Sequence, residues 1–382
     1  MSWESEGFDG ILTVIGWNQV DQRVRGFEVD SKQAGGRNTE VGVARDDQPG
    51  DVHRRVFLTG IAGMAAAAVG SVRGSQELSS QTTSSARPAA PAIPIIDTHI
   101  HLFDPTRPQG APYSGPPGQP PQPALPPRYR RLASPLGIVG AIKIEASPWV
   151  EDNLWVLDVA GRDTIVVGVV GNLEPDKPDF AEMFARYHKN PLFRGIRYGN
   201  LWGRDITKQA HNPAFIDGLK LVAQADLVLD TANPRVNLLE AIVKITDKAP
   251  ELRVVLDHLP SLDPTPDVRP AYEAALRELQ KRPRIYVKLS AVIHRVSGQV
   301  STELAPYRDR LDHLVGIFGE DRILFGSDWP NSDGVAPIDK VVGVVREYFT
   351  TQPRAVAEKY FWKNSVAAYK WIKRDPSQPA LG

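Results

Sequence analysis

The chain has 382 residues, enough for one large enzyme domain or two ordinary ones. Its 45 Lys and Arg balance its 45 Asp and Glu, so no basic surplus supports nucleic-acid binding as the main task. The absence of cysteine excludes disulfides, thiolate metal sites, iron–sulfur clusters and cysteine nucleophiles. A metal site in this chain must therefore use His, Asp or Glu.

The amino-terminal part of the chain predicts an export signal rather than an enzyme. Residues 1–50 are polar, and we expect them to reflect a translation start placed too far upstream. Arg54 and Arg55 precede the apolar run Val56–Val69, which resembles a twin-arginine signal and is short for a bilayer span. Residues 51–93 are then signal and Ser/Ala/Pro linker, which predicts a periplasmic or extracellular location. The alternative is a fortuitous arginine pair before an Ala-rich helix.

From residue 94 onward, short apolar runs alternate with stretches of helical periodicity. Eight runs are typical of strands: Ile93–Asp97, Ile138–Ile144, Thr164–Val170, Phe193–Tyr198, Leu227–Asp230, Arg253–Asp257, Ile285–Leu289 and Ile323–Gly326. Helical periodicity follows most of them: Asp179–Lys189, Asn212–Ala223, Pro234–Lys248, Pro270–Arg282 and Glu303–Phe318. The aromatic-rich stretch Arg354–Lys373 predicts a terminal helix. Eight such units favour an α/β fold, a single-domain (β/α)8 TIM barrel over residues 94–382.

Eleven prolines lie between Pro105 and Pro135. Because proline removes a backbone donor, residues 105–135 are predicted to be a loop with neither helix nor central strand. The loop follows the first strand, on the face where barrel enzymes place their sites, and forms either a lid or a structural wrap. Tyr113, Tyr129 and Arg130 are candidates to reach over a substrate.

Histidines and acids gather at the carboxyl ends of the predicted strands. The first strand ends in DTHIH, and its period of two predicts that Asp97, His99 and His101 share one side. The sixth strand ends beside His258, and the eighth leads into Asp328. Three imidazoles and a carboxylate at one barrel mouth can hold a metal ion or polarise a carbonyl. Taken singly, His258 could also be a core histidine and Asp328 a helix cap.

The chain resembles the amidohydrolase superfamily, in particular its amidohydrolase 2 branch of sugar lactonases (fuconolactonase and rhamnonolactonase) and pyrone-dicarboxylate lactonases. The resemblance implies a (β/α)8 barrel and an amidohydrolase-type hydrolase that opens a lactone or a related ester or amide. It also implies that Asp328 activates the attacking water, with His99, His101 and His258 around the carbonyl or the metal. It is carried by IIDTHIHLFDP (95–105), DNLWVLDVAGRD (152–163), FRGIRYGN (193–200), VVLDHLPSL (254–262), IYVKLSA (285–291) and ILFGSDWP (323–330).

A two-metal site is not expected. The fourth strand ends in Arg194–Tyr198 without a lysine suited to a bridging carbamate, and the fifth ends in Leu229–Thr231 without a histidine. One divalent ion, Zn²⁺ or Mn²⁺, or no metal then remains, since the resembling branch includes both states. We expect one ion rather than none, held by His99, His101, His258 and Asp328.

Further polar and aromatic residues near strand ends are candidate substrate contacts. Arg197 suits a substrate carboxylate or sugar oxygens. Ile142 and Ile144 are expected to face the helices, which would direct Lys143 and Glu145 into the barrel, and Lys288 is expected to form a deep structural salt bridge. Packing or ion pairing is the alternative for each contact. The candidate substrate-binding set is Arg197, Glu145, Tyr198, Trp329 and His294.

Two other functions stay open at this stage. A decarboxylase of the same branch would need a carboxylate clamp such as Arg197, and a non-catalytic exported sugar-binding barrel would bind without turnover. The DTHxHL opening also resembles metal-dependent DNases, but Arg194 and Arg197 stand where those enzymes need an acidic bridge. We therefore expect a small-molecule substrate, a lactone or related compound, with no nucleic-acid partner and no stable membrane span. Homo-oligomerisation is left open.

Overall fold

A computed structural model describes residues 92–113, 115–116 and 120–381. The predicted polar extension (1–50) and the predicted signal and linker (51–93), apart from its last two residues, lie outside the described residues. Within the described part, no helix is both long and apolar enough to cross a bilayer.

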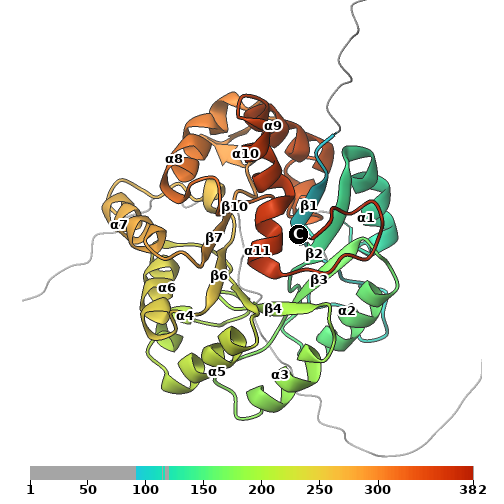
Figure 1. The fold of residues 1–382 in the computed structure, drawn as a ribbon, viewed down its shortest axis with the longest axis vertical. Coiled ribbons are helices and arrows are strands. Elements are labelled where there is room, and N and C mark those ends of the chain that lie inside the picture. Colours follow the sequence, from blue (N-terminus) through green and yellow to red (C-terminus); the bar gives the residue numbers. More distant parts are fainter. Residues whose placement is uncertain (1–91, 114, 117–119, 382) are drawn as a thin grey trace, which may run out of the picture. The chain divides into compact units, whose positions relative to one another are not determined.

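Eight parallel strands form the barrel that the sequence predicts (Figure 1). Backbone bonds close the ring between the first strand and the segment after the last one: Thr98 N donates to Phe325 O at 3.0 Å and His101 N to Trp329 O at 2.8 Å. The predicted barrel is confirmed. In spatial order the strands are β1 (Ile95–Ile100), β2 (Ile138–Lys143), β3 (Val166–Gly171), β4 (Phe193–Arg197), β5 (Val228–Asp230), β6 (Arg253–Leu256), β7 (Ile285–Lys288) and β10 (Ile323–Leu324).

Helices surround the barrel; α1 to α8 lie in the crossovers between parallel strands, and α9, α10 and α11 follow the last strand. They are α1 (Pro126–Ala133), α2 (Asp152–Gly161), α3 (Phe180–His188), α4 (Ile206–Gln209), α5 (Pro213–Gln224), α6 (Val236–Lys248), α7 (Arg269–Gln280), α8 (Arg308–Phe318), α9 (Ile338–Thr350), α10 (Arg354–Glu358) and α11 (Asn364–Tyr369). Short elements are the 3₁₀ turns η1 (Ser134–Leu136), η2 (Leu259–Ser261), η3 (Ala305–Tyr307) and η4 (Asn331–Gly334), the π turn η5 (Lys359–Lys363) and the hairpin β8 (Arg295–Val296) with β9 (Gln299–Val300).

The proline-rich stretch contains a helix, so the prediction of a loop over all of residues 105–135 is wrong. Helix α1 starts at Pro126 and Pro127, in the first turn, where the missing N–H has no partner inside the helix in any case. Tyr129 of α1 is fully buried, and its hydroxyl donates to Asp97 Oδ2 at 2.7 Å. Tyr129 therefore supports the barrel wall and does not reach over a substrate.

An apolar layer fills the barrel interior. This layer is a small cluster of side chains from several strands, and it is separate from the larger core between the barrel and the helices. The strand residues of the small cluster are Ile96, Ile142, Ile144, Val167, Val170, Val228, Val255 and Leu324. The prediction that Ile142 and Ile144 face the helices is therefore wrong. The alternation of the strand is regular, because a Cβ at Gly140 would point at Ile96 and Val167 of the same cluster, so positions 140, 142 and 144 all face inward. Lys143 lies near Asp152 at the start of α2, and burial lowers the pKa of Lys143 to about 8.

The carboxyl-terminal segment covers the amino ends of the strands. Helix α11 crosses the centre of the barrel in Figure 1, and Tyr369 and Trp371 join the interior cluster. Arg253 at the start of β6 donates to Ala368 O at 2.7 Å, and Ile372 N donates to Val167 O at 3.3 Å. The predicted terminal helix is real but interrupted by the π turn η5.

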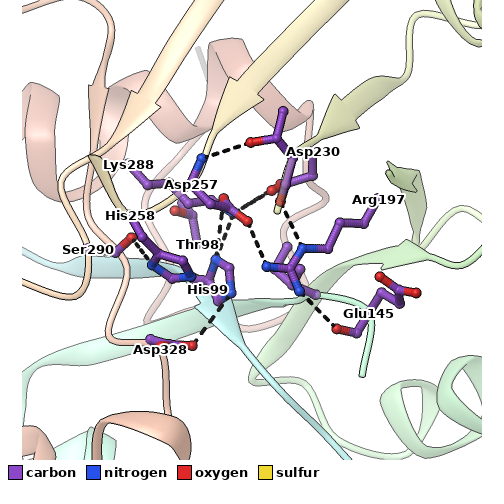
Figure 2. Close-up of polar contacts among 12 residues, drawn as sticks. Thr98, His99, Glu145, Arg197, Asp230, Asp257, His258, Lys288, Ser290 and Asp328 are labelled. Carbon is purple, nitrogen blue, oxygen red and sulfur yellow. Dashed lines mark hydrogen bonds and ion pairs between the residues drawn. The ribbon is translucent and has the colours of Figure 1, made fainter. Parts of the chain in front are cut away.

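Four ionisable side chains lie above this apolar layer, and all of them are fully buried (Figure 2). Lys288 Nζ lies 3.0 Å from both carboxylate oxygens of Asp230 and 2.9 Å from Asp257 Oδ1. It also lies 3.1 Å from His99 Nδ1. The Tyr369 hydroxyl, reaching up from the covered end, donates to Asp230 Oδ2. The predicted deep salt bridge of Lys288 is confirmed, and we call Lys288, Asp230 and Asp257 the buried charge cluster.

Trp371→Ala tests the covering role of the carboxyl-terminal segment. Trp371 is 1% exposed and donates from Nε1 to Ser365 Oγ at 2.9 Å. Removing this ring should lower the free energy of unfolding by about 3–5 kcal/mol in a urea titration. Trp149→Ala, at a ring that is 39% exposed, is the control and should change it by about 0.5 kcal/mol or less. Equal losses in the two variants would contradict the covering role.

Lys288→Met tests the buried charge cluster. It leaves two buried carboxylates without their ammonium, which should cost about 3–5 kcal/mol of unfolding free energy. Burial already raises the pKa of Asp230, so the folded variant binds protons that the unfolded chain releases. The deficit relative to wild type should therefore shrink as the pH falls from about 8 to about 5.

Lys281→Met is the matched control for this measurement. Lys281 Nζ lies 2.6 Å from Glu278 Oε1 in an exposed pair, so its loss should change the unfolding free energy by about 0.5 kcal/mol or less. A Lys288→Met deficit that stays constant over this pH range would contradict the assignment of two carboxylates sharing one ammonium.

Candidate active site

His99 lies near the carboxyl end of β1, and His101 directly follows the strand. Their Nε2 atoms are 3.2 Å apart at the barrel mouth. The prediction that Asp97 shares their side is wrong, because the strand register shifts between Asp97 and Ile100. Asp97 instead accepts hydrogen bonds from the Tyr129 hydroxyl and from Ser327 N at 2.8 Å, where it ties β1 to the segment after β10. Its role is to hold the strand ends together.

Asp328 lies directly against the two histidines. Its Oδ1 is 3.2 Å from His101 Nε2, 3.6 Å from His99 Nε2 and 3.0 Å from Asn331 Nδ2. Its backbone has a φ of 60°, in the left-handed region that residues with a Cβ rarely adopt. The chain just before Asp328 passes close to His99, and glycine at position 326 permits this, because a Cβ there would lie 2.8 Å from His99 Cβ. The backbone thus places this carboxylate over the imidazoles at some conformational cost.

His258 completes the group of imidazoles. Its ring centre lies 4.4 Å from that of His99, and its Nδ1 lies 2.8 Å from Ser290 Oγ. Its backbone is also left-handed, with a φ of 54°. The structure therefore brings together all four residues that the sequence predicts for the metal and the chemistry: His99, His101, His258 and Asp328.

In each of the three imidazoles, the protein engages the Nδ1 atom. His101 Nδ1 lies 3.1 Å from Ile144 O, while His258 Nδ1 contacts Ser290 and His99 Nδ1 contacts the buried charge cluster. Partners at Nδ1 fix the ring orientation of a histidine, as they do in metal sites. His99 and His101 then present Nε2 toward Asp328 (Figure 2 shows His99).

The spacing of these atoms fits a divalent ion. Ligand atoms at about 2.0–2.1 Å from a tetrahedral Zn²⁺ lie about 3.3 Å apart, and the three contacts among His99 Nε2, His101 Nε2 and Asp328 Oδ1 span 3.2–3.6 Å. Because Ile144 O only accepts, His101 carries its proton on Nδ1, and its Nε2 lone pair faces the Asp328 carboxylate. A proton or a metal cation between these two acceptors makes their contact favourable. His99, Asp257 and His258 form a second group with ligand spacing.

Burial and neighbouring charges set the protonation of the site. Burial, together with the Lys288 charge, lowers the pKa of His99 well below its usual range. Burial also lowers the pKa of His258. Burial alone would raise the pKa of Asp328, but the surrounding imidazoles outweigh it and hold that pKa below its ordinary value. Burial thus favours neutral rings at His99 and His258, and the positive charge of either ring, when it is protonated, favours the ionised carboxylate of Asp328.

Arg197 is committed to the protein itself. Its guanidinium donates to Asp257 Oδ2 at 3.1 Å, to Thr231 O at 2.8 Å and to Glu145 O at 3.4 Å. The side chain is 5% exposed. Glu145 is paired as well, since its Oε1 accepts from Arg204 Nη1 at 3.1 Å, while its buried Oε2 has no hydrogen-bond partner among the residues that the structure describes.

The other predicted substrate contacts are not gathered around the histidines. Tyr198 packs against Phe215, with ring centres 4.8 Å apart. Trp329 is fully buried against Tyr129, and His294 Nδ1 lies 2.7 Å from Val292 O. By contrast, the ring of Tyr113, one of the candidates to reach over a substrate, has its centre 6.3 Å from that of the His101 ring.

Several residues of the site were not predicted. Asp230 and Asp257 are the last residues of predicted strands. Their position at a strand end, which identified His258 next to Asp257, is the signal that could have identified them too. Ser290 follows β7 by two residues and Asn331 follows Asp328 by three. Only the contacts of the folded chain distinguish these two from other polar loop residues.

The chain is similar to known proteins in sequence. A family model described as amidohydrolase matches residues 96–371. The L-fucono-1,5-lactonase of Burkholderia ambifaria is 29% identical over 203 residues, which are 51% of this chain and 66% of that protein. The L-fucono-1,5-lactonase of Burkholderia multivorans is 25% identical over 261 residues, 64% of this chain and 84% of that protein.

A solved structure shows the same fold. An amidohydrolase from Burkholderia multivorans, crystallised with bound zinc, has a TM-score of 0.63 and 22% sequence identity, over 73% of this chain and 100% of that one. The family model, in turn, covers most of the chain. The predicted family, and with it the predicted amidohydrolase-type enzyme, is confirmed. The chain belongs to the amidohydrolase family.

Proposed function

We propose that this protein hydrolyses a lactone, using water activated by Asp328 at the mouth of the barrel. The observation that carries the proposal is the contact of an ionised carboxylate with two imidazoles, at 3.2 Å from His101 and 3.6 Å from His99. The L-fucono-1,5-lactonase relatives support a sugar-derived lactone as the substrate class.

Asp328 acts as the general base in this proposal. Its Oδ1 is engaged by His101 and Asn331, so Oδ2 is the oxygen that accepts a proton from water. Its lowered pKa keeps it ionised, and so free of a proton, at neutral pH. A positioned base of this kind contributes about 10²–10⁴ in rate.

His258 is suited to stabilise the carbonyl oxygen. When the Ser290 hydroxyl donates to Nδ1, the neutral ring carries its proton on Nε2 and can donate it to the developing oxyanion. Water then adds to the carbonyl carbon while its proton moves to Asp328. Breaking the ring C–O bond releases an alkoxide, which takes that proton back, and the product is the hydroxy acid.

A divalent ion fits the site as a resident cofactor. His99, His101 and Asp328 would hold it, with His258 near enough to take part, and Zn²⁺ or Mn²⁺ suits such imidazole and carboxylate donors. When bound, such an ion supplies Lewis-acid polarisation of the carbonyl and lowers the pKa of bound water. The zinc-bound amidohydrolase of similar fold supports this part of the proposal.

The surroundings favour lactone opening over decarboxylation. A decarboxylase of this branch would need Arg197 to bind the substrate carboxylate. The Arg197 guanidinium instead donates to the Asp257 carboxylate and to the backbone carbonyls of Thr231 and Glu145. Glu145, whose Oε2 is without a hydrogen-bond partner in the described part of the chain, remains our candidate for contact with substrate hydroxyls. Twin-arginine export to the periplasm stays a prediction.

Asp328→Asn tests the catalytic assignment. The variant should fold normally but lose about 10²–10⁴-fold in kcat, because the amide cannot accept the proton of water. A pH-indicator screen of aldonolactones, L-fucono-1,5-lactone included, measures the rate. Asp339→Asn, at an exposed carboxylate on α9, is the matched control and should keep wild-type turnover. Wild-type CO₂ release without lactone opening would instead support the decarboxylase.

Metal analysis of the purified protein tests the cofactor. We expect about one Zn or Mn per chain, lost on dialysis against a chelator and strongly reduced in His101→Ala. His211→Ala, at an exposed histidine, should leave the metal content unchanged. A content in His101→Ala equal to wild type would contradict the assigned ligands.

A further inference from the structure

Among the described residues of the segment between β1 and α1, Tyr113 lies next to the site. Phe103 and Ala124 hold the two ends of this segment together, with Phe103 N donating to Ala124 O at 3.1 Å and Ala124 N to Phe103 O at 2.9 Å. Between them, the Tyr113 ring packs edge-on against Phe103 at 5.1 Å and faces the His101 ring at 6.3 Å. The contacts to Phe103 and His101 bring Tyr113 to the edge of the catalytic group.

Tyr113 reaches the catalytic carboxylate through one intermediate residue. Its hydroxyl donates to Asn331 Oδ1, and Asn331 Nδ2 donates to Asp328 Oδ1 at 3.0 Å. Asn331 is the first residue of η4, three positions after Asp328. A second contact joins the same two regions, since Arg128 of α1 lies 3.4 Å from Asp333 of η4. The connection therefore links the segment after β1 to the segment after β10.

We propose that Tyr113 and Asn331 are positioning residues that hold the Asp328 carboxylate in its reactive orientation. This inference rests on the proposed function, because it assigns a task within the same site. Asn331 donates to Oδ1, the oxygen that also contacts the imidazoles, and this leaves Oδ2 directed to water. Tyr113 in turn fixes the Asn331 amide, because its hydroxyl donates to the amide oxygen and so leaves the amide nitrogen facing Asp328.

The backbone of Asp328 explains why such support is needed. Its φ of 60° is costly for a residue with a Cβ, and its backbone bonds, Asp328 N to His99 O at 2.9 Å and Ser332 N to Asp328 O at 3.0 Å, fix the main chain but not the side chain. A carboxylate also rotates about its terminal bond with little hindrance, so neighbouring hydrogen bonds decide where its two oxygens point. Burial and the Asp328 charge raise the pKa of Tyr113, which keeps its hydroxyl protonated as a donor.

The experiment is a double-mutant cycle on the full chain with Tyr113→Phe, Asn331→Ala and the pair. Asn331→Ala should lower kcat by about tenfold to a hundredfold with little change in KM, as expected from the loss of a hydrogen bond to a charged group. Tyr113→Phe keeps the ring packing and should lower kcat by about threefold to tenfold. Because Tyr113 acts through Asn331, the double variant should match Asn331→Ala within about twofold.

Tyr348→Phe is the matched control. Its hydroxyl donates to Asp312 Oδ1 at 2.7 Å between α9 and α8, so the same atom is removed beside a carboxylate outside the site, and kcat should not change. Unchanged kcat in Asn331→Ala and Tyr113→Phe, or losses that multiply in the double variant, would overturn the inference. A loss confined to KM would also overturn it.

Hydrogen–deuterium exchange of peptides within residues 104–113 separates this inference from the proposed function. Both single variants should raise exchange there relative to wild type, and Tyr348→Phe should not. If wild type opens no lactone, the proposed function fails, and raised exchange still supports the connection through Asn331. If exchange is unchanged in both variants, the inference fails whatever the activity.

Discussion

The rest of the site depends on the contacts that the ammonium group of Lys288 makes. It joins Asp230 of β5, Asp257 after β6 and His99 at the end of β1, all within 3.1 Å and all fully buried. Buried charges of this kind are costly unless every partner is present, so they hold three strand ends in one relative position. The apolar interior layer and the carboxyl-terminal segment below it keep water away from that end of the barrel.

The chemistry of the mouth follows from this fixed base. The Nδ1 atoms of His99, His101 and His258 are each engaged by the protein, which leaves the Nε2 atoms available at the mouth. Two residues in left-handed conformations, His258 and Asp328, complete the group. Regular strand geometry cannot place four such side chains together, and the register shift of β1 and the close approach at Gly326 make the arrangement accessible.

Sequence reasoning predicts the parts of this protein that depend on local pattern. Runs of β-branched residues identify the strands, and residues at the ends of strands identify His258 and Asp328. The predicted side-chain directions are wrong at Asp97, where the register of β1 shifts, and at Ile142, where the sequence alone does not tell which face of a regular strand points inward. Trp329 resembles a sugar-binding wall in the sequence but is buried behind the strand ends, a position that only tertiary packing determines.

In the proposed reaction, water activated by Asp328 attacks a lactone carbonyl, and hydrolysis in ¹⁸O-labelled water tests this step most directly. The acid formed by the wild-type enzyme should carry one ¹⁸O in its carboxyl group, because water bonds to the carbonyl carbon. Formation of that labelled product with Asp328→Asn should fall to the spontaneous rate. Label in the released hydroxyl group, or enzymatic labelling that persists in Asp328→Asn, would contradict the account.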